Sequence, residues 1–548
     1  MRLENYLNYR GICGINKNQK IFSRGEIMRP GRIDSGISWL SKFCAAVILV
    51  LSALFMLLLT LSAYTETANV STNNEAGELV EIYADNVFLN ILLLFLFISS
   101  LYLLYRHCVN FSLRRAELIL LALVFLLGLA FIVSVKLAAP WYSDSYQVLY
   151  AAERAASNDF DALDAYFYRF PFQLGYVLYA EVLFRLMGSL LPGMPSGYYR
   201  LALQGVNLLW LLLAYHALIQ LSQHLFKNHR VQAFTIILLL LCLPPVLSCT
   251  FLYGIIPGFA LGAVAMWMFA AFLQQRRLWQ GVLCALSLGL SVILKLNYMI
   301  FAVAICIIWM VDLLKNRGIK SLICLILTVA AVSTLNSAPQ TIYERRSGKD
   351  FGQGIPMLAW VAMGMSEGYA GPGWYKEDNT VKVFMETGMD AEATEENAIS
   401  VIQDRAAYFS VNPSKAWDFF WEKLRSQWNE PTYESLWINQ VQSSYGEKGR
   451  LYEWFCGAEE RLTITYMNQY QQLIFLGTLL SCIYLFIKRD ILQCLPILAV
   501  LGGILYHLLS EAKSQYALPY FILMVPLAAY GFCGLFHSVE HHSAQERK

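Results

Sequence analysis

The sequence predicts an all-α polytopic membrane protein with about twelve transmembrane helices. Of its 548 residues, 57% are hydrophobic and only 15% are charged, and the mean hydropathy is +0.47. A soluble domain carries fewer apolar and more charged side chains. Many apolar runs are also long enough to cross a bilayer as helices. Mostly short polar loops join these runs, and one long polar segment, 339–469, interrupts them.

The segment before the first apolar run, residues 1–38, is rich in Lys and Arg, and the positive-inside rule places it in the cytoplasm. The first run is too long for a signal-peptide core and lacks a cleavage site, so we expect no cleaved signal peptide. The expected spans lie at about 39–63, 87–105, 117–138, 200–222, 232–250, 254–274, 279–295, 297–313, 320–338, 470–487, 491–508 and 516–536.

One further apolar run, 170–192, has a length that suits a span but carries Glu181 and Arg185 in its middle. Ionised side chains at mid-bilayer are costly unless protein surrounds them. A helix lying at the interface would put this pair in water and its Phe, Leu and Tyr in lipid. The later basic clusters all fall on the cytoplasmic side only if this run does not cross. We therefore predict a juxtamembrane helix, with both chain termini in the cytoplasm.

These spans divide the chain into five regions. We expect a cytoplasmic segment 1–38, a transmembrane core 39–338 with an outer loop 139–199, an extracytoplasmic domain 339–469, C-terminal spans 470–536 and a cytoplasmic tail 537–548. Within the extracytoplasmic domain, the pattern predicts helices over 391–410 and 413–428 and a turn at Gly371–Gly373. The general composition suggests a bacterial plasma membrane.

The outer loop 139–199 contains the first polar stretch rich in aromatic and acidic residues, and Asp144 lies a few residues beyond the membrane edge. A carboxylate there is placed to meet the head group of a lipid-linked substrate and to act as a general base. The alternatives are an N-cap for a helix beginning near Tyr146 or a solvated acid. Asp159 or Asp161 would cap a second short helix.

The stretch WYSDSYQVLYAAERAASNDFDALDAYFYRFPFQLGYVLYAEVLFRLMG (141–188) resembles the first outer loop of GT-C superfamily glycosyltransferases. It is most similar to dolichyl-phosphate-mannose–protein mannosyltransferases and their bacterial relatives. That family places an acid early in this loop, here Asp144, and then two juxtamembrane helices, the second often starting with an aromatic-Pro pair, here Phe170-Pro171. Ser143 and Ser145 flank Asp144 where a second acid would complete a pair. We therefore expect no cofactor, because a divalent metal is not supported by a paired-acid motif.

Three further outer turns are similar to those of the family. FLYGIIPG (251–258) contains Tyr253, and SVILKLNYMIF (291–301) puts Lys295 at an outer helix end, where it would bind a lipid phosphate. The alternative for Lys295 is an ordinary snorkelling lysine. The stretch SEAKSQYALPYFILMVP (510–526) is similar to the family's last outer turn, or else is a short solvated loop. Its matching residues and their neighbours are Lys513, Tyr516, Glu511 and Gln515.

Aromatic and acidic residues also gather late in the extracytoplasmic domain, in SQWNEPTYESLWIN (426–439). Aromatic rings stack on sugars and carboxylates bind hydroxyls, so this stretch is a candidate sugar or acceptor contact. An aromatic belt at the membrane interface is the alternative. The stretch 360–375 is similar in kind. The candidate residues of 426–439 are Trp428, Glu430, Glu434 and Trp437.

The resemblance implies an inverting transfer of a sugar from a polyprenyl-phosphate monosaccharide to an acceptor outside the cytoplasm. The acceptor would be a cell-surface glycopolymer, a lipid-linked glycan or a protein. Asp144 would be the base, while Lys295 and Lys513 would hold the lipid phosphate. The partners are thus the lipid-linked donor, the acceptor and the bilayer, and no nucleic acid is expected. No Walker loop, dinucleotide fingerprint or HExxH motif indicates a nucleotide-sugar donor, hydride chemistry or a zinc peptidase.

Two other classes stay open. A transporter or flippase of lipid-linked saccharides would share the span count, but it would show buried charges within spans and repeat symmetry, which the sequence does not show. A polysaccharide polymerase or ligase would also have a large outer loop, and it would use lipid-diphosphate donors.

Overall fold

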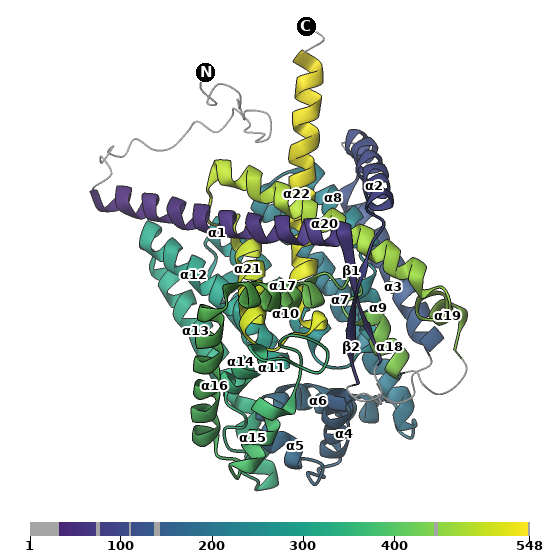
Figure 1. The fold of residues 1–548 in the computed structure, drawn as a ribbon, viewed down its shortest axis with the longest axis vertical. Helices are drawn as coiled ribbons and strands as arrows, with labels where there is room; N and C mark the ends of the chain where they lie inside the picture. Colours follow the sequence, from purple (N-terminus) through teal and green to yellow (C-terminus); the bar gives the residue numbers. More distant parts are fainter. Residues whose placement is uncertain (1–31, 73–76, 109–110, 136–142, 443–447, 546–548) are drawn as a thin grey trace.

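The computed structural model describes residues 32–72, 77–108, 111–135, 143–442 and 448–545. Helices dominate these ranges, and the prediction of an all-α polytopic membrane protein is confirmed (Figure 1). The first half contains α1 (Arg32–Thr65), β1 (Glu66–Ser71), β2 (Leu79–Ala84), α2 (Val87–His107), α3 (Leu113–Val135), α4 (Ser143–Ala156), α5 (Ala165–Arg169), η4 (Pro171–Gln173), α6 (Leu174–Leu190), α7 (Ser196–Phe226), α8 (His229–Leu241), α9 (Pro244–Leu247), η5 (Ser248–Thr250) and α10 (Ile255–Gln275). The second half contains α11 (Leu278–Leu294), η6 (Leu296–Tyr298), α12 (Met299–Asn316), α13 (Ile319–Ser347), α14 (Met357–Gly364), η7 (Glu377–Asn379), α15 (Val381–Glu386), α16 (Ala391–Val411), α17 (Pro413–Trp428), α18 (Ser435–Gln442), α19 (Arg450–Cys456), α20 (Glu460–Lys488), α21 (Leu495–Leu509) and α22 (Ser514–Gln545).

Every predicted span coincides with a helix, although the total of twelve is not confirmed. In the described part of the chain, nine helices are long and apolar enough to cross a bilayer. The number is ten if α8 and the segment Pro244–Thr250, bent by 50° from it, form one span. The predicted spans 279–295 and 491–508 fall on α11 and α21, which are apolar but shorter.

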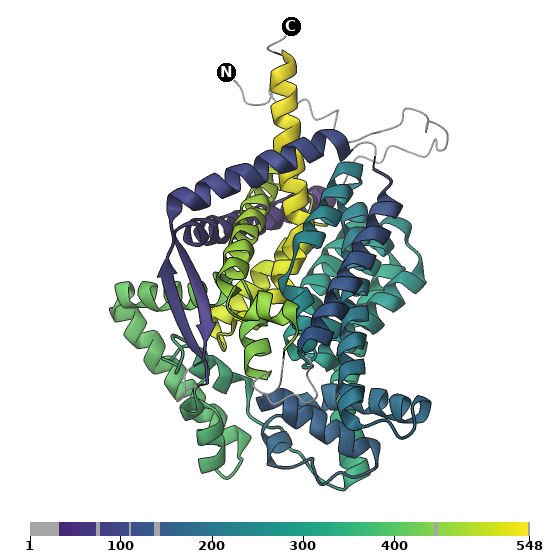
Figure 2. The ribbon, with the colours of Figure 1, turned by 90° about the vertical axis from the view of Figure 1, so that its right-hand side faces the viewer.

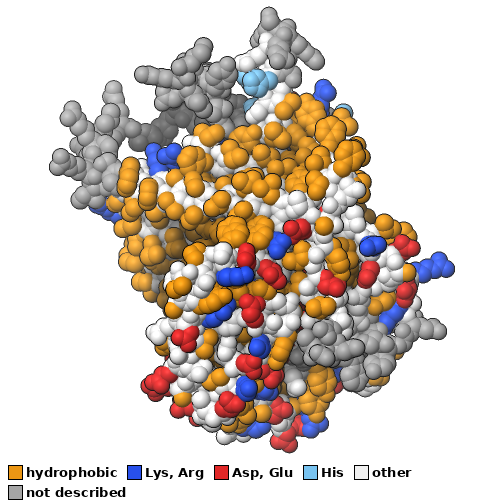
Figure 3. Space-filling view, in the orientation of Figure 1, with side chains coloured by type: hydrophobic (Ala, Val, Ile, Leu, Met, Phe, Trp, Pro, Cys, Tyr) orange, Lys and Arg blue, Asp and Glu red, His pale blue; other side chains and the backbone are white. Residues whose placement is uncertain are grey.

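The surface is divided into an apolar and a charged part. Figure 3 shows hydrophobic side chains over the upper half of the view, where α1 and α20 lie, and charged side chains over the lower half, where α15 and α16 lie. The C-terminal end of α22 projects beyond the apolar half, whereas α4, α5 and α6 lie at the opposite end (Figures 1 and 2). The loop that carries Asp144 is therefore far from the C-terminus.

Between α1 and α2 the chain forms an antiparallel hairpin, β1 and β2, in the acidic loop for which no strands were predicted. Its register pairs Glu66 with Ala84 and Ser71 with Leu79. Contacts with the distant helix α17 support the first strand: the Ala68 N–H donates to the Asn429 carbonyl at 3.0 Å. A two-stranded ribbon is marginal by itself, so this tertiary support explains why the local sequence did not reveal it.

Two membrane helices continue well past the predicted spans. α13 extends to Ser347 and α20 starts at Glu460, so the predicted domain borders near 338 and 470 fall inside continuous helices. Within the polar segment 339–469, the predicted helices at 391–410 and 413–428 are confirmed as α16 and α17. The predicted turn at Gly371–Gly373 is also present, and Gly373 has the positive φ of +73° that favours glycine.

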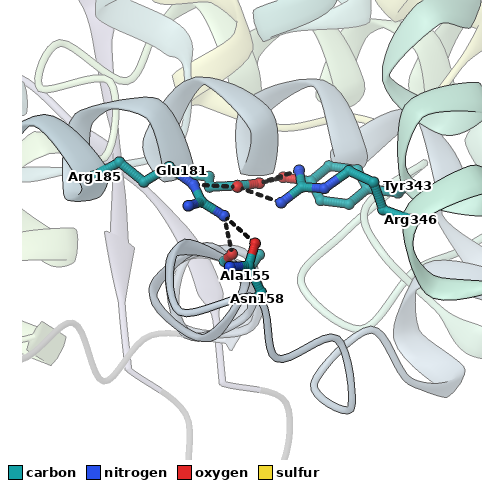
Figure 4. Close-up of polar contacts among 6 residues, drawn as sticks. All are labelled: Ala155, Asn158, Glu181, Arg185, Tyr343 and Arg346. Atoms are coloured by element: carbon teal, nitrogen blue, oxygen red, sulfur yellow. Dashed lines mark hydrogen bonds and ion pairs between the residues drawn. The ribbon is translucent and has the colours of Figure 1, made fainter.

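The run 170–192 forms η4 and α6, and α6 is not among the helices that qualify as spans in the described chain. The expectation that its ion pair lies in water is wrong. Glu181 is only 3% exposed, because Arg346 of α13 binds both its carboxylate oxygens at 2.7 and 2.9 Å (Figure 4). Tyr343 donates a third bond at 2.6 Å and Arg185 a fourth at 2.8 Å. Protein, rather than water, thus compensates this carboxylate.

Candidate active site

A cavity of about 860 Å³ opens between α4, the turn before α10, the end of α11 and the α21–α22 turn. Its volume lies within the usual range for small-molecule sites, about 300–1,000 Å³. It brings together residues from four segments that are far apart in the sequence. The residues of our prediction that line it are Asp144, Tyr253, Lys295, Glu511, Lys513, Gln515 and Tyr516.

Asp144 lies inside the first turn of α4, so it is not the residue that precedes the helix as an N-cap would. Its carboxylate accepts a 2.7 Å hydrogen bond from the Tyr253 hydroxyl. Gln173 of η4 in turn donates to the Tyr253 oxygen. A carboxylate in a first turn is stabilised by the helix dipole. Asp164, and not Asp159 or Asp161, caps the short helix α5.

Gly254 fixes the position of Tyr253. It has φ +84° and directly precedes α10. A Cβ at this position would lie 2.2 Å from the carbonyl oxygen of Leu294, so only glycine allows the two turns to approach this closely. Because Leu294 is the last residue of α11, the approach places Tyr253 beside Lys295.

The Lys295 ammonium lies between two tyrosine rings. Its Nζ is 3.7 Å from the centroid of the Tyr253 ring and 5.1 Å from that of Tyr516. Such cation–π contacts stabilise an ammonium in partly desolvated surroundings. Among the described residues no carboxylate is ion-paired with Lys295. Burial lowers the pKa of Lys295 to about 7, against the raising effects of Asp144 and Glu511.

The turn between α21 and α22 also lines the cavity. Tyr516 donates to Glu511 at 3.4 Å, so each ring beside Lys295 belongs to a tyrosine bonded to a carboxylate. Burial raises the pKa of Glu511 to about 7, against the opposing effect of Lys513. Lys513 itself is paired with Glu78, from the loop before β2, at 2.5 Å.

Glu430 and Trp428, which we predicted as substrate contacts, do not line the cavity. Both are fully buried and lie outside the cavity lining, because they form the structure behind the α21–α22 turn. Ser514 lies 2.9 Å from Glu430 and 3.1 Å from Glu434, and the Gln515 N–H donates to Glu434 at 3.2 Å. Burial raises the pKa of Glu434 to about 8. These acids hold the turn in place from within the protein.

Aromatic residues complete the wall around the mouth. Trp437 lines the cavity, as do three aromatic residues of the stretch 360–375, namely Trp360, Tyr369 and Tyr375. Glu78 and Gln173 also line the cavity, and sequence reasoning missed both. Glu78 is one of several acids in its loop, with no local signal to distinguish it, and only the tertiary pairing with Lys513 identifies it.

The described lining contains five acids and two lysines, so the ammonium groups are the scarce charges of the site. One carboxylate, Asp144, is bonded to Tyr253, and a second, Glu511, is bonded to Tyr516, and both tyrosine rings contact Lys295. The arrangement suits proton abstraction beside a lysine whose charged form Asp144 and Glu511 favour. In the described part of the chain, no three His, Cys, Asp or Glu side chains form a metal-binding group.

No protein-family model matches the sequence, and no curated protein matches it. Among solved structures, one similar chain is the archaeal oligosaccharyltransferase AglB from Archaeoglobus fulgidus, in complex with an inhibitory peptide and a dolichol-phosphate. The TM-score is 0.38 at 13% sequence identity, and the match covers 79% of this chain and 51% of the other. The chain thus matches about half the length of that enzyme.

Proposed function

We propose that this protein is a GT-C-type membrane glycosyltransferase that moves a sugar from a polyprenyl-phosphate monosaccharide to an acceptor outside the cytoplasm. The observation that carries the proposal is that Tyr253 contacts both Asp144 and Lys295 at the wall of one large cavity. A base and a cation held at a fixed spacing are what transfer from a lipid phosphate requires. The sequence resemblance supplies the reaction class.

In the proposed reaction, the acceptor hydroxyl gives its proton to Asp144 as its oxygen attacks the anomeric carbon. The bond from that carbon to the phosphate oxygen breaks, and the lipid phosphate leaves with the bonding electrons. Attack opposite the leaving group inverts the configuration. Lys295 stabilises the charge that develops on the phosphate, and Tyr253 keeps the Asp144 carboxylate oriented.

A lipid-linked donor agrees with the position of the cavity. α13 is an apolar helix with only 22% of its most apolar window buried inside the protein, so much of it is available to lipid. The same helix lines the cavity through Asn336, Ser337 and Pro339. A polyprenyl chain following α13 would reach the polar cavity without leaving the bilayer.

The proposal places both termini in the cytoplasm and the cavity outside. The position of α4–α6 opposite the C-terminal end of α22 supports this arrangement, as does the basic N-terminal segment. A tag accessible only from the outside at either end of the chain would contradict it.

Transfer by the Asp144→Asn variant tests the mechanism. Membranes that contain the full-length variant should lose transfer from a polyprenyl-phosphate sugar and keep wild-type protein levels. Asp161→Asn is the matched control, because this exposed acid belongs to the same loop and does not line the cavity. Full activity of Asp144→Asn would exclude Asp144 as the base.

The same membranes separate the rival classes. Transfer that requires a lipid-diphosphate donor would indicate a polymerase or ligase. Lipid-linked saccharide that crosses sealed vesicles with no acceptor present would indicate a flippase.

A further inference from the structure

A second hollow, of about 470 Å³, lies beside the hairpin. It is formed by one face of β2 and the C-terminal half of α17, which pack together beside each other in Figure 1. Its volume also lies within the range of small-molecule sites. Below, this space is called the second hollow. Its lining residues are Glu66, Val80, Ile82, Ala84, Ala370, Gly371, Glu422, Arg425 and Ser426.

The polar side of the second hollow offers both hydrogen-bond donors and acceptors. Arg425 forms an ion pair with Glu66, and its Nε is buried without a hydrogen-bond partner among the described residues. The same guanidinium lies 5.4 Å from the centroid of the Trp421 ring, which orients it. Glu422 is exposed at the rim and contributes a second carboxylate. Such a set matches a ligand with several hydroxyl groups.

The opposite side of the second hollow is apolar. Val80, Ile82 and Ala84 alternate along β2 and therefore present one face to it. A sugar ring has hydroxyl groups at its edge and C–H groups on its faces, so it is complementary to a site with one polar and one apolar side. A lipid chain would leave the charges unsolvated, which is unfavourable.

The two hollows are neighbours. Ala370 lines both of them, and Tyr369, the residue before it, lines the large cavity. The hairpin likewise contributes Glu78 to the large cavity and Val80 to the second hollow. A chain of sugars bound in the second hollow would thus extend its end into the cavity that contains Asp144.

From this arrangement we infer that the second hollow is a binding site for an oligosaccharide acceptor. The inference rests on the proposed function, and it commits to a glycan where the transfer reaction alone leaves a glycan, a lipid or a protein open. An extended peptide along β2 is the competing occupant.

Binding of short oligosaccharides to the full-length protein in lipid nanodiscs tests the inference separately from catalysis. Arrays of immobilised oligosaccharides and of peptides are the probes. Glu422→Gln should bind oligosaccharides about tenfold more weakly than wild type, because a charge-assisted hydrogen bond is lost. Asp418→Asn is the matched control, since this exposed acid also belongs to α17 but does not line the second hollow. It should bind as wild type does.

Three results would each overturn the assignment. Glu422→Gln could bind oligosaccharides as tightly as wild type, or Asp418→Asn could lose as much affinity as Glu422→Gln. The wild-type protein could also bind peptides and no oligosaccharides. Asp144→Asn should bind oligosaccharides normally. If Asp144→Asn binds them and also keeps full transfer activity, the proposed mechanism fails while the assignment of the second hollow stands.

Discussion

The hydroxyl of Tyr253 donates a 2.7 Å hydrogen bond to Asp144, and the ring of the same tyrosine lies 3.7 Å from the Lys295 ammonium. One side chain thus sets the positions of the proposed base and of the proposed phosphate ligand. Tyr253 is itself fixed by Gly254, which allows the turn before α10 to touch the end of α11.

Tyr253→Phe separates these two contacts. The ring stays beside Lys295, while the hydrogen bond to Asp144 is lost. We expect kcat to fall about tenfold or more and the donor KM to change little, because hydrogen bonds to charged groups contribute about 1.5–3 kcal/mol. Initial rates at varied donor concentration measure both constants. Tyr179→Phe is the control, since its hydroxyl bonds Trp210 outside the cavity lining; an equal loss there would refute a specific role for Tyr253.

Lys295→Met should lower kcat about a hundredfold, the scale of losing one group that stabilises a developing charge. Lys295→Arg should recover part of the rate, because the charge returns with a different shape. Single-turnover transfer from the lipid-phosphate donor is the measurement. Lys382→Met, an exposed lysine of α15, should behave as wild type. A Lys295→Met enzyme with normal turnover would argue for a snorkelling lysine.

The pair of Glu78 and Lys513 should couple energetically, since both side chains are nearly buried, with 11% and 12% exposure. We expect Glu78→Gln and Lys513→Met each to destabilise the protein. The double variant should lose about 1–2 kcal/mol less free energy of unfolding than the sum of the two single losses. Unfolding titrations in mixed micelles of the wild type, both single variants and the double variant measure this double-mutant cycle. Strict additivity would show that the contact contributes nothing.

Glu181→Gln should destabilise the protein by about 3 kcal/mol, because it removes the carboxylate that Arg346 and Arg185 share. The partial exposure of both arginines keeps the loss at the lower end of the range for buried pairs. The same unfolding titrations measure it, and Glu386→Gln, at an exposed position of α15, is the control. If both variants unfold alike, α6 is not held to α13 by this network.

The difference in stability between the Glu511→Gln variant and the wild type should depend on pH. Burial raises the pKa of Glu511 from an ordinary 4.5 to about 7. Between these values the folded protein keeps a proton that the unfolded chain releases, so wild-type stability falls as pH rises through this window. Glutamine does not ionise, so the variant does not lose this stability as pH rises. The variant should therefore gain most over wild type at pH 8 and least near pH 5, as thermal unfolding at the two pH values would show. An equal gain at both would contradict an ionising Glu511.

The residues of the candidate site could be predicted largely because they lie at the ends of apolar runs, next to polar turns. The distribution of basic clusters among the loops predicted that Asp144, Lys295 and Lys513 lie on the same side of the membrane. The structure brings them to one cavity. The same reasoning did not separate Glu430 and Trp428, which are buried and outside the lining, from residues that line the cavity. Sequence shows that a stretch is polar and aromatic, but it does not show which side chains face a cavity and which support its wall.

Glu181 shows a related limit. Its helix, α6, is not among those that qualify as spans in the described chain. The expectation that its charge pair lies in water was wrong. The partner that stabilises Glu181 is Arg346, on a helix that continues past its predicted end. Pairing across such a sequence distance leaves no local pattern.

By itself, the sequence determined the membrane class, the positions of the apolar helices and the turns that line the large cavity, because apolar run length and charge distribution depend on local composition. Only the tertiary structure decided the hairpin beside α17, the pairing of Glu78 with Lys513, and the placement of Lys295 between Tyr253 and Tyr516. These features depend on close packing between segments remote in the chain, which no single stretch of sequence encodes.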